Sequence, residues 1–317
     1  MTGSSLQELD QNGAGSDSSK SVKSAITVSG VVKKFGKTTA LDGLSMNIPT
    51  GSVYALLGRN GAGKSTLVQL LMAMMDRDSG TISVLGHDPA KEPEALKQRV
   101  GYIPDRLPMY DWMTVAEVLK FTSAFYERWS REEEIALVKR FGLNTTQKVS
   151  SLSRGYRALL ALVIAMAHNP DIVLLDECTS GMDAIARREF ERSVIEALQQ
   201  SGRTVLFVGH QIDEMERICD HVGIIKDGKM LIEMPLDQLK DTVKLLRITG
   251  EDNLPTNAPG CRVIEVKRIG REQLVKVELS KAGVMPTLPP GLMIQETVNL
   301  SLEEIFVALL DIPQEAI

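Results

Sequence analysis

Short apolar and β-branched runs recur along the chain, separated by glycine-containing turns or by longer helical stretches. Strands are predicted at Ile26–Val32, Leu44–Ile48, Ser52–Leu57, Asp171–Leu175, Thr204–Val208, Val222–Lys226 and Lys229–Ile232. Helices are predicted at Lys64–Met75 and Ala184–Gln200. Because strands alternate with helices, we expect an α/β fold whose mostly parallel sheet is covered on both faces. Asp227 and Gly228, between the last two strands, predict a hairpin.

The segment from about 89 to 170 has a different pattern and is predicted to be mainly helical. Half of the aromatic residues of the chain lie between positions 102 and 129. Phe121, Phe125 and Trp129 are spaced four residues apart, which predicts that they form the core of a helical subdomain. Tyr110 and Trp112 precede that helix, and they either join this core or anchor a partner protein.

The two ends of the chain differ from its middle. Residues 1–24 are dominated by Ser, Gly and acidic residues without any aromatic residue, which predicts a disordered tail, a tag or a linker. After Asp241, short β-like runs separated by Pro and Gly precede an apolar helix at Leu302–Leu310. We therefore expect a main domain at 25–241 and a small α/β or α+β accessory domain at 242–317.

Composition narrows the possible functions. The 317 residues carry a formal net charge of −5, which argues against a nucleic-acid binder. Three widely spaced cysteines, Cys178, Cys219 and Cys261, predict reduced thiols rather than disulfides or a metal cluster. The chain has no apolar run approaching the ~20 residues that span a bilayer, and no signal peptide is evident. Any membrane role is expected to act through another chain.

A glycine-rich loop carries the strongest chemical signal. Residues 58–65 read Gly-Arg-Asn-Gly-Ala-Gly-Lys-Ser and match the P-loop pattern G-x-x-x-x-G-K-[ST]. Glycines allow successive backbone N–H groups to converge on phosphate oxygens, and the following helix adds positive potential. An ordinary Gly-rich turn is the alternative, but the strand before the loop and the helix after it argue against that. Phosphate contacts are predicted for Gly58, Asn60, Gly61, Ala62, Gly63, Lys64, Ser65 and Thr66.

The P-loop gives specific roles to a few polar side chains. Lys64 is predicted to reach the β- and γ-phosphates, and the Ser65 hydroxyl to coordinate Mg²⁺. The apolar strand at Asp171–Leu175 runs directly into Asp176 and Glu177. Asp176 is predicted to hold Mg²⁺, and Glu177 to polarise the attacking water as general base. Many strands end in acids, so this pattern gains its meaning from the P-loop upstream.

With the motif Leu152-Ser153-Arg154-Gly155-Tyr156, residues 26–241 resemble the ATP-binding cassette (ABC) family. That family's signature motif usually reads Leu-Ser-Gly-Gly-Gln. The resemblance implies that Ser153 and Gly155 face the γ-phosphate held by another subunit. Ser153 can also cap the following helix, and the alternative is that it does only this.

The resemblance extends to three further positions. Residues 180–183 resemble the family's D-loop, which implies that Asp183 lies along a dimer seam near the nucleotide. His210 follows a strand and resembles the switch histidine that contacts the γ-phosphate and assists catalysis. Phe35 resembles the aromatic residue that stacks on adenine; the alternative is a core aromatic at a strand end.

Three motifs depart from the family pattern, at four positions. Asp105 stands where the Q-loop usually has Gln, and its carboxylate can still reach Mg²⁺ or a bound water. Arg154 and Tyr156 replace Gly and Gln of the signature, and Cys178 replaces the Pro that commonly follows the catalytic Glu. These departures, together with the sequence at 301–306, look most like the ATPase subunits of bacterial ABC-2-type exporters.

The resemblance implies a P-loop NTPase core with a helical signature subdomain and a β-rich antiparallel N-terminal part. It also implies ATP and Mg²⁺ as cofactors and a head-to-tail dimer with a second ABC ATPase subunit, identical or different. A multi-span membrane permease is the expected partner, which would place the chain at the cytoplasmic face of the cell membrane. The alternative functions are an ATPase acting on the ribosome or nucleic acid and a P-loop kinase.

Overall fold

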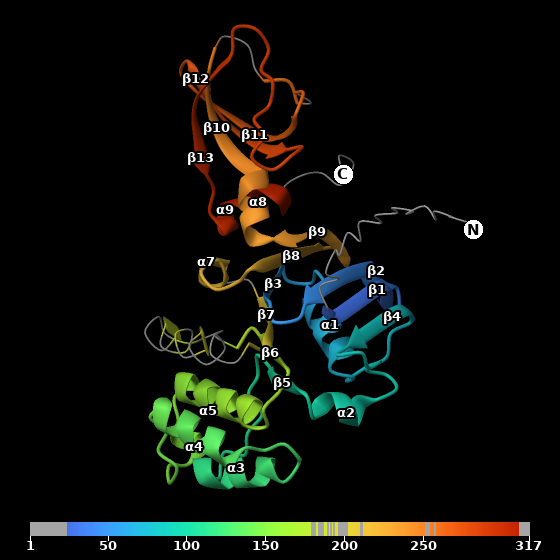
Figure 1. Cartoon of the computed structure of the whole chain (residues 1–317), viewed down its shortest axis with the longest axis vertical. Helices are drawn as coiled ribbons and strands as arrows, with labels where there is room; N and C mark the ends of the chain where they lie inside the picture. The colour runs from blue at the N-terminus through green and yellow to red at the C-terminus, as the bar shows by residue number, and fades with distance from the viewer. Residues whose placement is uncertain are drawn as a thin grey trace, which may run out of the picture.

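The computed structural model describes residues 24–178, 182, 187–188, 190, 192, 194–195, 202–209, 212–250, 254–256 and 258–310. Three β-sheets organise this part of the chain, with six, three and four strands. In Figure 1 the six-stranded sheet occupies the middle of the molecule, the four-stranded sheet lies above it, and α3, α4 and α5 lie below.

The six-stranded sheet has the strand order β5-β6-β7-β3-β8-β9. All neighbouring strands are parallel except β8 and β9. Alternate residues of β6 enter different cores, with Val173 and Leu175 on one face and Ile172 and Leu174 on the other. The predicted sheet, buried on both faces, is therefore confirmed. Its strands are β3 (Val53–Gly58), β5 (Val100–Ile103), β6 (Ile172–Asp176), β7 (Thr204–Gly209), β8 (His221–Lys226) and β9 (Lys229–Pro235).

The structure contains a predicted hairpin at the edge of this sheet and a predicted helix after β3. Asp227 and Gly228 both have positive φ, 49° and 75°, as the tight hairpin between β8 and β9 requires. Helix α1 (Lys64–Leu71) ends earlier than predicted, because Ala73 adopts a left-handed conformation with φ 54°. The predicted helix at 184–200 falls largely outside the described residues.

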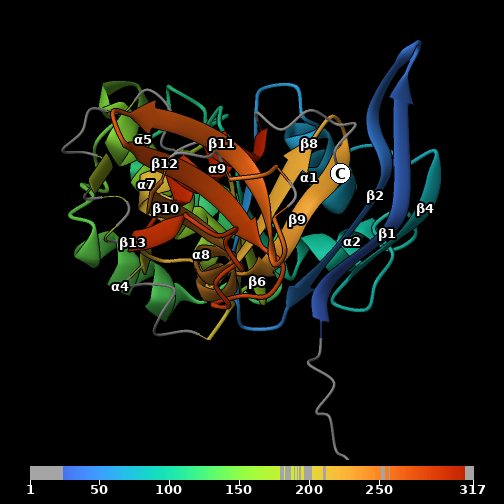
Figure 2. The same ribbon diagram turned by 90° about the horizontal axis from the view of Figure 1, so that it is seen from above.

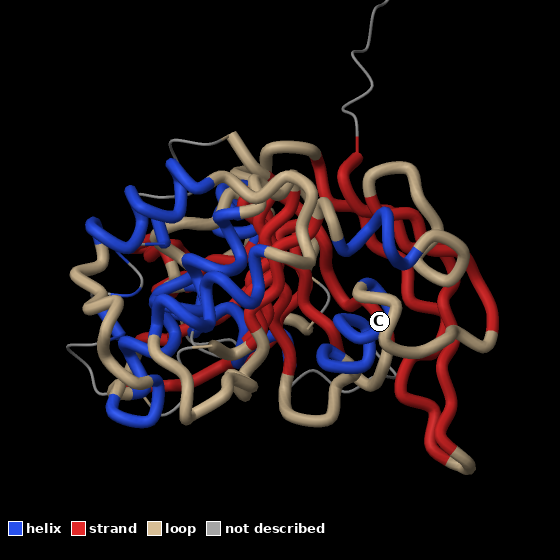
Figure 3. The backbone as a smooth tube through the Cα atoms, turned by 90° about the horizontal axis from the view of Figure 1, so that it is seen from below, coloured by secondary structure: helices blue, strands red, loops and turns tan. Residues whose placement is uncertain are grey.

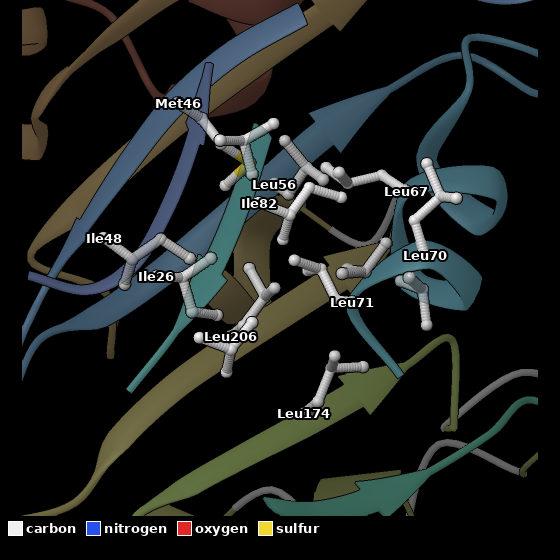
Figure 4. Packing of buried hydrophobic residues seen from close by; sticks show 14 of the residues in the cluster. Ile26, Met46, Ile48, Leu56, Leu67, Leu70, Leu71, Ile82, Leu174 and Leu206 are labelled. Carbon is white, nitrogen blue, oxygen red and sulfur yellow. The ribbon is translucent and has the colours of Figure 1, made fainter. Parts of the chain in front are cut away.

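An antiparallel sheet of order β2-β1-β4 covers one face of the six-stranded sheet together with α1. Figures 2 and 3 show this sheet on the side of the molecule opposite the helical subdomain. Between the two sheets, Ile26, Ile48 and Ile82 pack against Leu67 of α1 and Leu206 of β7 (Figure 4). The sheet contains β1 (Ser24–Phe35), β2 (Thr38–Pro49) and β4 (Ser79–Val84); β4 was not predicted.

The helical subdomain packs on the other face of the six-stranded sheet through α5. Residues at the helix starts form capping hydrogen bonds: Thr114 and Glu117 form a capping box at α3, and Ser130 caps α4. Its helices are α3 (Val115–Ser123), α4 (Arg131–Arg140) and α5 (Arg154–Ala167), with a 3₁₀ turn, η1, at Val149–Ser151. The short helix α2 (Pro93–Lys97) instead buries Leu96 in the core shared with α1 and the antiparallel sheet.

The prediction of an aromatic core in this subdomain was wrong for two residues. Phe121 and Phe125 are 44% and 62% exposed, whereas Trp129 packs against the buried cluster as predicted. Phe121 contacts Phe125 and Tyr110 edge to face, at ring separations of 5.2 and 5.7 Å. Helix α3 ends at Ser123, so Phe125 lies in the turn after it, and both Phe rings are on the outside of the subdomain.

The C-terminal part forms an antiparallel sheet of order β11-β12-β10-β13. Its strands are β10 (Val243–Thr249), β11 (Cys261–Ile269), β12 (Glu272–Leu279) and β13 (Met293–Asn299). The nearby helices are α7 (Ile212–Met215), α8 (Leu236–Thr242) and α9 (Leu302–Leu310). The last strand, β13, was not predicted, because its sequence lacks a run of apolar residues. The division of the chain near Asp241 remains our proposal, and residues 1–23 of the predicted tail lie outside the described residues.

The three cysteines are buried thiols, in agreement with the prediction of reduced side chains. Within the residues described by the structure, no helix has the length and apolar character needed to cross a membrane.

Candidate nucleotide-binding site

The glycine-rich loop connects the C-terminal end of β3 to the N-terminus of α1. Gly61 and Gly63 adopt positive φ angles of 84° and 107°, which side chains with a Cβ strongly disfavour. A Cβ on Gly58 would lie 2.6 Å from Cγ2 of Ile225, and one on Gly63 would lie 2.5 Å from the Ala40 carbonyl oxygen. The loop therefore needs glycine both for its conformation and for its contact with β2 and β8.

Lys64 begins α1 and is almost fully buried. Its ammonium donates to the carbonyl oxygens of Gly58 at 2.7 Å and Arg59 at 3.3 Å, so the side chain folds back across the loop. Burial lowers the pKa of Lys64, while the nearby carboxylates of Glu177 and Asp176 act in the opposite direction. Ser65, the next residue, is exposed at the same helix end.

Asp176 is the last residue of β6, and its side chain is buried. Burial raises its pKa to about 6, and the charges of Glu177 and Asp105 add to that rise. Lys64 and a hydrogen bond from the Tyr102 hydroxyl partly offset these effects. The negative charges of Glu177 and Asp105 thus disfavour ionisation of Asp176, but among the described residues no group of three or more acidic, His or Cys side chains is arranged to hold a metal ion.

Glu177 follows Asp176 in a left-handed conformation with φ 48°, unusual for a residue other than glycine. Its N–H donates to the Val208 carbonyl oxygen at 2.9 Å, so the end of β7 fixes its backbone. Its carboxylate lies 3.9 Å from the Lys64 ammonium. Strained backbone of this kind concentrates at functional sites, and here it brings the two predicted catalytic and phosphate-binding side chains together.

The signature motif lies at the N-terminus of α5. Ser153 caps this helix by accepting a hydrogen bond from the Tyr156 N–H at 3.3 Å, as predicted, and Gly155 is buried in the first turn. Two arginines of the same turn form ion pairs with the loop after β5. Arg154 contacts Asp105 at 3.3 Å and Arg157 contacts Asp111 at 2.7 Å.

Sequence reasoning missed both ion pairs and the hydrogen bond from Tyr102 to Asp176, because each joins residues that are distant in sequence. The family departures at 105 and 154 were the available signal for one pair: an acid and a base replace two uncharged residues.

Phe35 ends β1 near the tip of the β1–β2 hairpin, which projects from the body of the molecule (Figure 2). It is 49% exposed, so the alternative of a core aromatic is wrong. The same hairpin reaches the glycine-rich loop through Ala40, which crowds Gly63. Asp183 and His210 lie outside the described residues.

An apolar groove of about 480 Å³ adjoins the loop after β5. Residues lining it include Met74, Tyr102, Leu107, Met109, Tyr110 and Phe121. Trp112, beside Tyr110 at a ring separation of 6.0 Å, extends this apolar surface and is 66% exposed.

The chain is similar to known ATP-binding proteins of ABC transporters. The family described as "ABC transporter" matches residues 41–180. The ABC transporter ATP-binding protein YtrB of Bacillus subtilis is 30% identical, over 84% of this chain and 92% of its own length. The daunorubicin/doxorubicin resistance ATP-binding protein DrrA of Streptomyces peucetius is 33% identical, over 69% of this chain and 68% of its own.

A solved structure of an ATP-binding subunit of an ABC transporter superposes with a TM-score of 0.62 at 25% identity. The match covers 68% of this chain and 92% of that one. The similarity therefore extends over nearly the whole of the solved cassette.

Proposed function

This chain belongs to the ABC transporter ATP-binding protein family, and from that premise we propose that it drives an exporter of the ABC-2 type. The chain binds and hydrolyses ATP as the nucleotide-binding subunit of an ABC transporter. The observation that carries the proposal is that Lys64, Asp176 and Glu177 lie together at the glycine-rich loop. In addition, Arg154 of the signature helix forms an ion pair with Asp105 in the loop after β5. The relatives' names refer to transport or drug resistance, which favours transport over the ribosome or nucleic acid.

Phosphate binding is assigned to the loop and Lys64. The backbone N–H groups of residues 58–66 and the positive end of α1 would surround the phosphates. The Lys64 ammonium, now bonded to two loop carbonyl groups, would exchange these for phosphate oxygens. Phe35 would stack on the adenine from the exposed hairpin, and Asn60 and Thr66 would complete the polar surface around the phosphates.

Water activation is assigned to Glu177. Its carboxylate is partly exposed beside Lys64, and its backbone is held by Val208. A carboxylate placed beside the γ-phosphate can accept a proton from the attacking water as the new P–O bond forms and the bond to the β-phosphate breaks. His210 is proposed to contact the same γ-phosphate.

Mg²⁺ is proposed to bind at the same site, where the Ser65 hydroxyl is exposed and burial, together with the charges of Glu177 and Asp105, raises the pKa of Asp176. Ser65, Asp176 and Asp105 are the residues that would hold it, directly or through water. When bound, Mg²⁺ neutralises charge on the phosphate oxygens.

A second cassette subunit is proposed to complete the site. Ser153 and Gly155 lie at the positive end of α5, and we propose that this end faces a nucleotide held by the facing subunit, as the resemblance to the ABC family implies. Asp183 is proposed to lie along the seam between the subunits. Binding of ATP would close this head-to-tail dimer and loss of the γ-phosphate would open it. The homodimer is the form that the purified chain alone can make.

The membrane permease is proposed to dock at the apolar groove and its exposed aromatic residues. The groove is lined by residues of the loop after β5, which Arg154 and Arg157 connect to the signature helix. Motion of that helix on ATP binding would therefore reach the permease. This arrangement would place the chain at the cytoplasmic face of the membrane.

Co-purification tests the transport role. Tagged chain, extracted from its native membrane with mild detergent, should retain a multi-span membrane protein. Trp112→Ala should weaken that retention, whereas Ile269→Ala, an exposed apolar residue on the four-stranded sheet, should not. Recovery of ribosomes or nucleic acid in place of a membrane protein would refute the proposal.

A further inference from the structure

The C-terminal helix α9 packs against the nucleotide-binding part of the chain as well as following its own sheet. Its buried face shares one core with α7, with the turn after α7, and with β8. In Figure 1, α9 lies below the strands of the four-stranded sheet and above α7 and β8. The α9 residues in this core are Leu302, Ile305, Phe306 and Leu309; the α7 segment contributes Ile212, Met215 and Cys219.

Both ends of α9 are bound by charged side chains from the nucleotide-binding part. The Glu216 carboxylate accepts a hydrogen bond from the Leu302 N–H at 3.0 Å. At the other end, the Lys226 ammonium donates to the Leu310 carbonyl oxygen at 2.8 Å. An acid at the helix N-terminus and a base at its C-terminus both match the helix dipole. Lys240 pairs with Glu216 at 2.6 Å and holds the carboxylate in place.

The anchor at Glu216 is connected to the hydrolytic site through Met215 and Gly209. Met215, beside Glu216, packs on Gly209 at the end of β7. A Cβ on Gly209 would lie 3.0 Å from Met215 Cε and 3.9 Å from Glu177 Cγ. The same end of β7 supplies the carbonyl group of Val208 that binds the Glu177 N–H. Gly209 therefore lies between α7 and the proposed general base.

The anchor at Lys226 is connected to the phosphate loop through the neighbouring residue Ile225. Lys226 directly follows Ile225, which pairs with Gly58 in the sheet and fills the space that a Cβ on Gly58 would need. The two ends of one helix thus hold the strand beside the phosphate loop and the helix beside the general base.

We propose that α9 is a positioning element for ATP hydrolysis and that Glu216 is the positioning residue through which it acts. By holding α7 on the end of β7, α9 fixes the backbone from which Glu177 reaches the attacking water. The proposal rests on the assignment of Glu177 made above. Because small displacements of a catalytic group cost far more in turnover than in substrate binding, loss of the anchor should lower kcat selectively.

The test replaces Glu216 in the full chain. Glu216→Gln should lower kcat for ATP hydrolysis about tenfold, with KM and the Kd for a fluorescent ATP analogue changed less than about twofold. Glu216→Asp, which keeps the charge, should recover most of the lost turnover. As a matched control, Glu265→Gln removes an acid that pairs with Lys276 at 2.7 Å within the accessory sheet, and it should leave kcat unchanged.

A Glu216→Gln protein with wild-type kcat would overturn the proposal. A loss of kcat would also refute it if nucleotide affinity fell by a similar factor and the melting temperature dropped, since that combination indicates only a structural role. If this variant fails to fold, Lys226→Met breaks the other anchor and should also lower kcat selectively; wild-type turnover there would likewise refute it. A wild-type chain that does not hydrolyse ATP, or a Glu177→Gln variant with normal turnover, would instead refute the assignment of Glu177.

Discussion

Arg154 Nη2 lies 3.3 Å from Asp105 Oδ1, joining the first turn of the signature helix to the loop after β5. Both residues stand where related cassettes have uncharged side chains, so two departures in sequence form one ion pair in space. The pair connects the helix end that we propose to face a partner's nucleotide to the loop beside the proposed permease groove.

A double-mutant cycle measures this pair. Both side chains are 45% exposed, so we expect a coupling energy between Arg154→Ala and Asp105→Ala of about 0.2–1 kcal/mol. Added salt at 1 M should reduce it, because exposed charges are screened. Chemical denaturation of the four proteins gives the coupling. A value above about 2 kcal/mol that is insensitive to salt would show a buried interaction that this geometry does not contain.

Lys64→Ala should abolish measurable nucleotide binding. Charge-assisted hydrogen bonds to phosphate are each worth about 1.5–3 kcal/mol, which predicts a loss of affinity of roughly hundredfold or more. Titration with a fluorescent ATP analogue checks this value. Lys97→Ala, at the end of α2, is the control and should bind as the wild type does. Tight binding by Lys64→Ala would remove the phosphate-binding role from the loop.

Gly58→Ala should destabilise the protein and weaken nucleotide binding together. The added Cβ would lie 2.6 Å from Ile225 Cγ2 and 2.7 Å from the Ile225 carbonyl oxygen, so the loop or β8 has to move. We expect a loss of about 1–3 kcal/mol in the free energy of unfolding. Gly61→Ala is the comparison: it meets no atom within 4 Å and costs only its positive φ, about 1–2 kcal/mol. Equal nucleotide binding by Gly58→Ala and wild type would contradict the close approach.

The parallel sheet and the phosphate loop could be predicted because their signals are local. A strand, a glycine-rich loop and a helix follow one another in sequence, and the apolar runs at 171–175 and 204–208 both became buried strands. The tight turn at Asp227 and Gly228 is likewise encoded by residues that tolerate positive φ.

What could not be predicted depends on contacts between distant residues. Spacing predicted Phe121 and Phe125 on one helix face, yet α3 ends at Ser123 and the packing of the subdomain leaves both rings exposed. Arg154 and Asp105 are 49 residues apart, and Glu216 meets the N–H of a residue 86 positions later. Strand β13 has alternating polarity too weak to detect, and it is fixed by pairing with β10.

In the proposed mechanism, ATP bound at the glycine-rich loop is enclosed by the signature helix of a second copy and hydrolysed with Glu177 as base. The decisive experiment measures the mass of Glu177→Gln by light scattering in ATP and Mg²⁺, together with its ATPase rate. The variant should bind ATP, turn it over at least about 100-fold more slowly than wild type, and double in mass. Adding Lys64→Ala should return it to the monomer. Wild-type turnover, or an ATP-bound variant that keeps the mass of a single chain, would contradict the account.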